Sequence, residues 1–324
     1  MSSRDVLRVD GLHVTVGGRG PVEAVRDVSF AVRRGEAVGL VGESGSGKTL
    51  TCRSVLGVLA PGCAVSAGRI TLDDIELTGL DRRGWRAVRG NRIGAVFQDP
   101  ASYLNPSITV GRQLAEQLRV KRDLDRQVAR ERAVGLLAAM GLRRAEAVYH
   151  QYPHELSGGM LQRVLIAIAV AGEPELLVAD EATTALDVAV QAEVLELLQR
   201  LRRERGLALL LVSHDLAVVA EVCDRIVVFY AGEVVETGPT AEVLARPRHP
   251  YTEALLRVAS LGDWERRELE IIPGRPPEAG QAPPGCRFAG RCGYAVDACH
   301  DTAVPLSADA RCLRAGELTL RGVR

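Results

Sequence analysis

The segment Gly42–Thr49, with the sequence GESGSGKT, constrains the fold of this chain more than any other feature, because it fits the pattern G-x-x-x-x-G-K-[ST]. It follows a continuous apolar run, Ala37–Val41, and precedes Leu50–Leu59, whose apolar residues have helical spacing. A buried strand, a glycine-rich turn and a helix in this order can hold a phosphate group, since backbone N–H groups of the turn converge on the anion. The sequence therefore predicts an α/β fold with a phosphate-binding loop.

The side chains of this loop fit a nucleoside triphosphate bound together with Mg²⁺. Lys48 can bridge β- and γ-phosphate oxygens, and the Thr49 hydroxyl can be a ligand of Mg²⁺. Lysine is rare in this chain, which has 41 basic residues but only Lys48 and Lys121 as lysines, so its place in the motif is informative. The residues that we expect to contact the nucleotide here are Gly42, Ser44, Gly45, Gly47, Lys48 and Thr49.

A second pattern, Leu176–Glu181, is an apolar strand that ends in two carboxylates, Asp180 and Glu181. A buried strand avoids charges unless a cation or a reacting water molecule lies at its tip. Asp180 is therefore predicted to hold Mg²⁺ through water. Glu181 is the predicted general base, which polarises the water that attacks the γ-phosphate.

The rest of the chain indicates an α/β core with an insertion and an appendage. Short apolar runs between turn signals predict strands joined by hairpins in residues 1–100. Gly111–Met140 has helical periodicity, with candidate core positions at Leu114, Leu118, Val128, Val134, Leu137 and Ala138. Prolines and glycines then mark a boundary near residue 240. We expect a domain at 1–240, with a helical subdomain at about 99–170, and an extension at 241–324.

Composition excludes several classes of protein. Lys+Arg and Asp+Glu both number 41, so the chain lacks the basic charge expected of a protein that binds nucleic acid along its length. The apolar runs are shorter than the roughly 20 residues needed to cross a bilayer. Met1–Asp10 carries charges and no apolar core, so it does not read as a secretory signal. A cytoplasmic location is expected.

A third motif, Leu156–Arg163 with the sequence LSGGMLQR, resembles the signature of ATP-binding-cassette (ABC) proteins. Ser157, Gly158 and Gly159 precede a helical run and offer a second helix N-terminus to an anion. Three further motifs of that family stand in the family's order in this chain, namely the Q-loop glutamine Gln98, the D-loop Ala185–Asp187 and the switch histidine His214.

The resemblance covers about residues 6–255. It implies a P-loop NTPase (RecA-like) core with an antiparallel β subdomain and a helical ABC subdomain, and a chain that hydrolyses ATP. It also implies that Gln98 senses Mg²⁺ and the γ-phosphate, and that His214 contacts the γ-phosphate. The signature and Asp187 would lie at a dimer interface that encloses two nucleotides. The chain departs from the family at Val16, where an aromatic ring against adenine is usual.

Particular segments narrow the resemblance to the ATPases of dipeptide, oligopeptide and nickel importers, namely the GGMLQR form of the signature at residues 158–163 and residues 97–106, 182–187 and 249–252. They are similar to the first of two ATPase subunits. This implies a heterodimer with a paralogous ATPase, two transmembrane permease subunits, an extracytoplasmic solute-binding protein as an indirect partner, and a peripheral place on the cytoplasmic face of the cell membrane. Peptide is the expected substrate, with nickel, a metal chelate or another small solute as alternatives.

A soluble ABC ATPase that acts on nucleic acid is a distant alternative. Such proteins carry a long coiled coil or two cassettes in one chain. Residues 99–156 leave room for a small helical subdomain only, so no nucleic-acid partner is expected.

Four of the seven cysteines, Cys286, Cys292, Cys299 and Cys312, lie close together near the C-terminus, which indicates a shared ligand. The resemblance implies a 4Fe-4S cluster, because related peptide-transporter ATPases carry one on such a tail, and four thiolates satisfy it. Zn²⁺ is the alternative, although the tight C-x2-4-C pair usual in zinc sites is absent. Unliganded thiols, or a cluster that regulates the ATPase in response to oxidation, are further alternatives.

Overall fold

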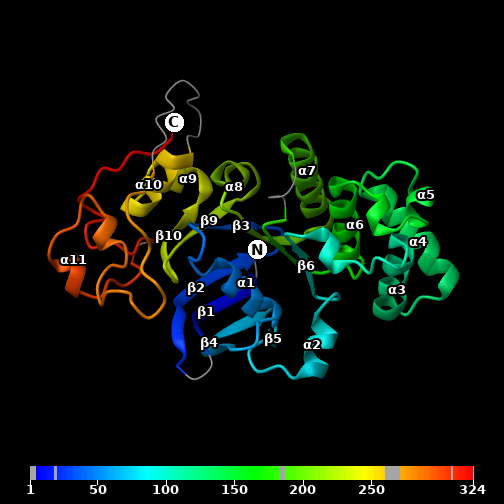
Figure 1. Ribbon diagram of the computed structural model, residues 1–324, viewed down its shortest axis with the longest axis horizontal. Coiled ribbons are helices and arrows are strands. Elements are labelled where there is room, and N and C mark those ends of the chain that lie inside the picture. The colour runs from blue at the N-terminus through cyan, green and yellow to red at the C-terminus, as the bar shows by residue number, and fades with distance from the viewer. Residues whose placement is uncertain (1–4, 18–19, 183–186, 260–270, 308, 324) are drawn as a thin grey trace. The chain divides into compact units, whose positions relative to one another are not determined.

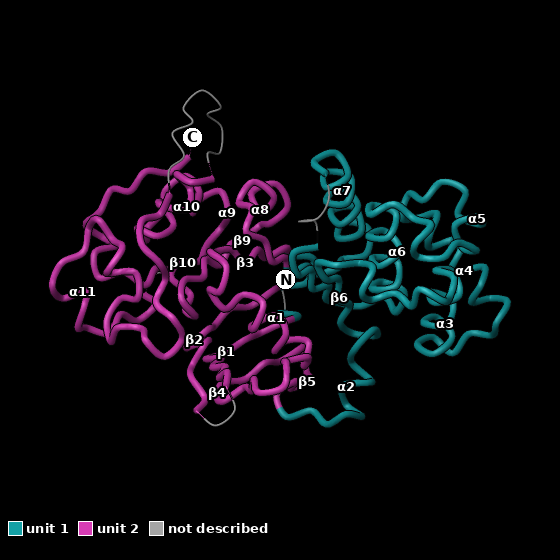
Figure 2. The backbone as a smooth tube through the Cα atoms, viewed as in Figure 1, with its two compact units in different colours: residues 1–6, 33–36, 79–210 teal, residues 7–32, 37–78, 211–324 magenta. Residues whose placement is uncertain are grey.

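The computed structural model describes residues 5–17, 20–182, 187–259, 271–307 and 309–323 (Figure 1). The chain divides into two compact units, which Figure 2 shows in different colours. Unit 1 comprises residues 1–6, 33–36 and 79–210, and unit 2 comprises residues 7–32, 37–78 and 211–324.

Unit 2 contains a four-stranded sheet in the order β2-β1-β4-β5. Strand β1 pairs antiparallel with β4, and β4 pairs antiparallel with β5. Leu7 lies opposite Leu72 and Val9 opposite Ile70, so buried side chains face one another across the β1–β4 pair. The strands are β1 (Asp5–Val16), β2 (Val22–Arg33), β4 (Cys63–Leu72) and β5 (Ile75–Glu76).

A mixed sheet in unit 2 carries the phosphate-binding loop. Strand β3 (Ala37–Val41) runs parallel to β9 (Arg225–Tyr230), which pairs antiparallel with β10 (Glu233–Pro239). All five residues of β3 are buried. Gly39 lets a helix pack closely on this strand, because a Cβ there would lie 2.5 Å from Cγ1 of Val219. The helices of this unit are α1 (Lys48–Leu56), α8 (Leu216–Val222), α9 (Thr240–Ala245) and α10 (Pro250–Ala259).

Unit 1 combines parallel strands with most of the helices. Strand β6 (Ile93–Phe97) runs parallel to β7 (Leu176–Asp180). Strand β8 (Ala208–Val212) begins in this unit, where Ala208 N–H donates to the carbonyl of Glu175, and it ends in unit 2. The helices are α2 (Arg82–Val88), α3 (Val110–Arg122), α4 (Arg126–Ala139), α5 (Ala145–Tyr149), α6 (Gly158–Val170), α7 (Val188–Arg205) and the 3-10 helices η1 (Pro100–Tyr103) and η2 (Pro153–Glu155). Among the helices of the described ranges, none is both long and apolar enough to span a membrane.

The predicted helical segment Gly111–Met140 is two helices, α3 and α4, and only part of its predicted core is correct. Leu114, Leu118 and Leu137 are buried, whereas Val128 is 42% exposed. The difference arises at Asp125, whose carboxylate caps α4 by accepting from the N–H groups of Gln127 and Val128. A new helix begins there and its phase buries other positions, namely Ala129, Ala133 and Met140.

The C-terminal segment of unit 2 has little regular structure, with η3 (Ala289–Arg291) and α11 (Ala298–Asp301) as its helices within the described residues. It is held instead by hydrogen bonds. Arg311 N–H donates to the carbonyl of Val235, and its guanidinium donates to the carbonyls of Val234 and Val304 at 3.0 and 2.9 Å. The segment is therefore fixed to β10 of the mixed sheet.

Candidate functional site

The predicted phosphate-binding loop has the backbone that its glycines allow. Gly42, Gly45 and Gly47 all have positive φ, at 144°, 78° and 103°. At Gly42 a Cβ would also lie 2.1 Å from the carbonyl oxygen of Phe229, so no side chain fits there. Gly47 is the N-cap of α1, which places the loop at the start of that helix. The loop N–H groups and the helix N-terminus together favour an anion.

Lys48 lies at the centre of this loop. Its side-chain ammonium donates to the carbonyls of Gly42 and Glu43, at 2.7 and 2.9 Å, and to Oγ of Ser46 at 3.2 Å. The residue is only 4% exposed. Its charge is thus held inside the curve of the loop, where phosphate oxygens can replace these carbonyl partners.

The other predicted residues of unit 2 lie in two segments, the phosphate-binding loop with the start of α1, and the turn after β8. Ser44 is exposed at the tip of the loop, and Thr49 is a half-buried residue in the first turn of α1. His214 is exposed in the turn between β8 and α8. That turn is built by its neighbours, because Asp215 N–H donates to Oγ of Ser213 at 2.9 Å and the Asp215 carboxylate caps α8.

In unit 1 the structure brings Gln98 and Asp180 to neighbouring strand ends. Phe97 at the end of β6 pairs in register with Asp180 at the end of β7, and Gln98 is the next residue. Asp180 is 7% exposed and Gln98 is exposed. A buried carboxylate beside an amide oxygen at one edge of a parallel sheet suits a hard cation.

Glu181 follows Asp180 and has a left-handed backbone, with φ of 51°. A residue other than glycine rarely adopts this conformation, and such strain is concentrated at functional sites. The turn takes Glu181 out of the buried strand, since its side chain is half-buried whereas all five residues of β7 are buried.

The signature residues stand at the start of α6. Ser157 is the N-cap, and its Oγ accepts from Met160 N–H at 3.4 Å, while Ser157 and Gly158 are exposed. Gly159 allows close packing, because a Cβ there would lie 2.4 Å from Cγ1 of Val190 in α7. Asp187 caps α7 by accepting from Val190 N–H at 2.9 Å. Val190 therefore links the starts of α6 and α7, because its side chain packs on Gly159 and its N–H donates to Asp187. Ala185 and Leu186 of the predicted D-loop lie outside the described residues.

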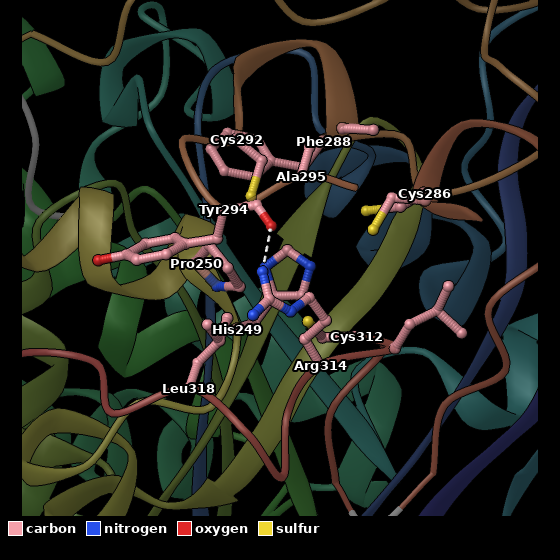
Figure 3. A pocket seen from close by; sticks show the side chains of 13 residues that line it. His249, Pro250, Cys286, Phe288, Cys292, Tyr294, Ala295, Cys312, Arg314 and Leu318 are labelled. Carbon is pink, nitrogen blue, oxygen red and sulfur yellow. Dashed lines mark hydrogen bonds between the residues drawn. The ribbon is translucent and has the colours of Figure 1, made fainter. Parts of the chain in front are cut away.

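The four C-terminal cysteines do line one pocket in unit 2, together with His249 and Phe288 (Figure 3). The prediction of a 4Fe-4S cluster there is nevertheless wrong, and its Zn²⁺ alternative fails for the same reason. Within the ranges that the structure describes, no three His, Cys, Asp or Glu side chains form a group that could hold a metal ion.

Burial also disfavours the charged form of three of these thiols. A metal binds the thiolate form of cysteine. Burial raises the pKa of Cys286 to about 11, and burial also raises the pKa of Cys292 and of Cys312 above the usual value. The clustering in the sequence predicted a shared ligand, whereas the four side chains line a pocket in which the described residues form no group that could hold a metal ion.

One group of residues was not foreseen from the sequence. Glu43, inside the phosphate-binding loop, forms an ion pair with Arg291, and its N–H donates to the hydroxyl of Tyr251 at 2.8 Å. Burial alone would lower the pKa of Arg291, but hydrogen bonds to Glu43 and Tyr230 raise it above the usual value. The signal in the sequence was slight, namely a carboxylate inside a motif that binds anions.

Comparison with known proteins assigns these motifs to a family. Residues 25–184 match the family described as "ABC transporter". A putative peptide import ATP-binding protein of Brucella melitensis is 46% identical over 336 residues, which cover 98% of this chain and 99% of the relative. The oligopeptide transport ATP-binding protein AppD of Bacillus subtilis is 46% identical over 280 residues, 86% of this chain and 85% of AppD. This chain therefore belongs to the ABC transporter family and is an ATPase of that family.

The C-terminal part narrows the assignment, because residues 235–299 match the family described as "Oligopeptide/dipeptide transporter, C-terminal region". Among solved structures, a dimeric post-hydrolysis state of the ATP-binding cassette MJ0796 bound to ADP and Pi is similar, with a TM-score of 0.65 and 28% identity. The match covers 72% of this chain and 98% of that chain. The ABC ATPase fold, with an antiparallel sheet, a mixed sheet and helices, is thus as expected from the sequence.

Proposed function

We propose that this chain is the ATP-hydrolysing subunit that energises an importer of peptides. The observation that carries the proposal is the phosphate-binding loop around buried Lys48, in a chain whose residues 235–299 match the oligopeptide/dipeptide transporter C-terminal region. The relatives named as peptide import and oligopeptide transport ATP-binding proteins support the substrate class.

In this proposal the loop holds the phosphates of ATP. Gly42, Gly45 and Gly47, which have positive φ, together with Ser44 would offer their backbone N–H groups to the β-phosphate. Lys48 exchanges the carbonyls that it contacts now for β- and γ-phosphate oxygens.

Mg²⁺ would be held by Thr49, Gln98 and Asp180, which supply the oxygen ligands that this cation prefers. When bound, it would neutralise charge that develops on the phosphates. Asp180, a carboxylate that is 7% exposed at the end of β7, supports this assignment, because carboxylate oxygens are ligands that Mg²⁺ prefers.

Glu181 is proposed as the general base for the attacking water, and His214 as a contact of the γ-phosphate. The left-handed backbone at Glu181, directly after the buried strand β7, supports a functional role, because strained backbone clusters at functional sites.

Ser157, Gly158, Gly159 and Asp187 are proposed to face a nucleotide held by a second ATPase subunit. Their exposed helix starts support this role, as does the dimeric state of the similar cassette MJ0796. We propose a heterodimer with a paralogous ATPase, bound to two permease subunits on the cytoplasmic face of the membrane and served by a solute-binding protein. Residues 1–240 would form the nucleotide-binding domain and residues 241–324, with the cysteines, its C-terminal extension.

The test of catalysis is Glu181→Gln, which keeps the shape of the side chain and removes the base. Loss of a general base lowers a rate by about 100- to 10,000-fold, so kcat for ATP hydrolysis should fall within that range while ATP binding is kept. Glu204→Gln on the exposed face of α7 is the matched control and should leave kcat unchanged. Near-normal turnover in the Glu181 variant would refute the assignment of the base.

The test of substrate class uses the complex with its permease subunits and solute-binding protein in proteoliposomes. Peptide-loaded binding protein should stimulate ATP hydrolysis and labelled peptide should accumulate. Stimulation by nickel or a metal chelate with no response to peptides would refute the peptide proposal while leaving the ATPase intact.

A further inference from the structure

Three polar groups of Glu43 are each held by a different partner in unit 2. Its N–H donates to the hydroxyl of Tyr251 at 2.8 Å, and its carbonyl accepts from the ammonium of Lys48 at 2.9 Å. Its carboxylate accepts two hydrogen bonds from Arg291, at 2.7 and 3.1 Å. The peptide group that contacts Lys48 is therefore fixed by side chains from the C-terminal part of the chain.

Arg291 is built into its place rather than resting on the surface. Its side chain is only 6% exposed, and each of its five N–H donors has a partner. Besides the two bonds to Glu43, it donates to the hydroxyl of Tyr230 at 3.2 Å and to the carbonyls of Pro273 and Ile272 at 2.7 and 3.0 Å. A guanidinium that is bound on every side holds its carboxylate partner in one geometry.

Aromatic rings support the same arrangement. Tyr230 and Tyr251 have ring centroids 4.5 Å apart, and both contact the ring of Phe288, three residues before Arg291. The guanidinium of Arg291 also lies over the ring of Tyr230, at 5.7 Å from its centroid. The hydroxyl of Tyr251 and the guanidinium of Arg291 thus share one rigid support.

Because Glu43 is negatively charged, its ion pair with Arg291 affects the electrostatics of the loop as well as its geometry. A carboxylate inside a loop that receives phosphates repels the anion, unless a cation neutralises it. Arg291 supplies that cation from 248 residues further along the chain.

From these contacts we propose that Arg291 and Tyr251, here called the tail clamp, are positioning residues for ATP binding, which hold and neutralise Glu43 so that the phosphate-binding loop accepts the triphosphate. The proposal rests on the role of this loop proposed above. In this proposal the C-terminal segment contributes to ATP binding through Glu43 and not by contact with the nucleotide.

The main test measures the Kd for ATP and the KM and kcat for hydrolysis with the full chain. Arg291→Gln leaves the Glu43 carboxylate without its guanidinium, so Kd and KM should rise at least tenfold while kcat stays within about twofold. Adding Glu43→Gln removes the unpaired charge and should restore most of the affinity. The ratio of the Kd values of Arg291→Gln and wild type should also fall as salt is raised, because ions screen the repulsion.

Two further variants separate positioning from stability. Tyr251→Phe keeps the ring and removes only the hydroxyl that accepts a hydrogen bond from Glu43 N–H. The usual free energy of one such hydrogen bond corresponds to an affinity for ATP that is about two- to tenfold weaker. Arg311→Gln is the matched control, because Arg311 is a buried arginine of the same C-terminal segment that bonds instead to Val234, Val304 and Asp27. It should lower the unfolding midpoint without changing the Kd for ATP.

The outcomes are distinguishable. If Arg291→Gln binds ATP like wild type while Lys48→Ala does not, the tail clamp is refuted and the proposed role of the loop stands. If Lys48→Ala binds ATP normally, the role of the loop itself fails. If Arg311→Gln weakens ATP binding as much as Arg291→Gln, the effect is one of general stability and the clamp is refuted.

Discussion

Lowering the pH from 7 to 5 should destabilise the folded chain by about 2 kcal/mol through one side chain, His249. This histidine is 1% exposed and lines the cysteine pocket of Figure 3. Its Nδ1 accepts a hydrogen bond from Tyr251 N–H at 3.0 Å, which requires an unprotonated Nδ1. Burial, with the positive charge of Arg311 as a further cause, lowers the pKa of His249 from 6.5 to about 3.

The sign and size of this loss of stability follow from the difference in proton binding between the folded and the unfolded chain. Above pH 6.5 the imidazole is neutral in both states and contributes no pH dependence. Below it, the unfolded chain binds a proton that the folded chain excludes until about pH 3, so stability falls by about 1.4 kcal/mol for each pH unit in that window. Between pH 7 and pH 5 the loss therefore amounts to about 2 kcal/mol.

Urea denaturation at the two pH values measures this loss, with His249→Asn as the comparison. Asparagine can keep an acceptor for Tyr251 N–H and does not titrate. The carboxylate of Glu236 accepts a hydrogen bond from the backbone N–H of His249 at 2.9 Å, and burial raises the pKa of Glu236. Protonation of Glu236 therefore stabilises the folded chain as the pH falls, but Glu236 is present in both proteins. The variant should lose about 2 kcal/mol less than wild type on acidification. An equal loss in both proteins would refute the assignment to His249.

Three glycine substitutions test the packing around the predicted nucleotide-binding motifs. Gly42→Ala should lower the free energy of unfolding by about 3 kcal/mol or more, since it combines strain at a φ of 144° with a Cβ 2.1 Å from the Phe229 carbonyl oxygen. Gly45→Ala, which is also left-handed but meets no atom within 4 Å, should cost only about 1 kcal/mol in the same urea titration, and equal costs would contradict the clash. Gly159→Ala should destabilise the chain by about 1–3 kcal/mol against Val190, and combining it with Val190→Ala should recover most of that loss. Additive losses in this double variant would show that the two residues are not coupled.

Local patterns in the sequence predicted much of the site. The apolar run Ala37–Val41 is β3, with the predicted bounds. The loop and helix after β3 were also predictable, because a glycine with positive φ and a helix start are set by neighbouring residues. The order of the motifs was enough to predict an ABC ATPase.

The cysteines show where such reasoning stops. Their clustering in the sequence predicted a shared metal cluster, and the structure shows instead that the four side chains line one pocket. The clustering did not indicate that, within the described residues, their arrangement forms no group that could hold a metal ion, because the positions of side chains in a pocket depend on everything packed around them.

The sequence by itself determined the strand β3, the glycine-rich loop after it and the start of α1, since these depend on hydrogen bonds and side-chain periodicity within a few residues. Only the tertiary structure decided that Arg291 neutralises Glu43 and that Val190 packs on Gly159. Contacts of this kind form between segments that the whole fold brings together, and their geometry follows from the packing of the chain as a whole.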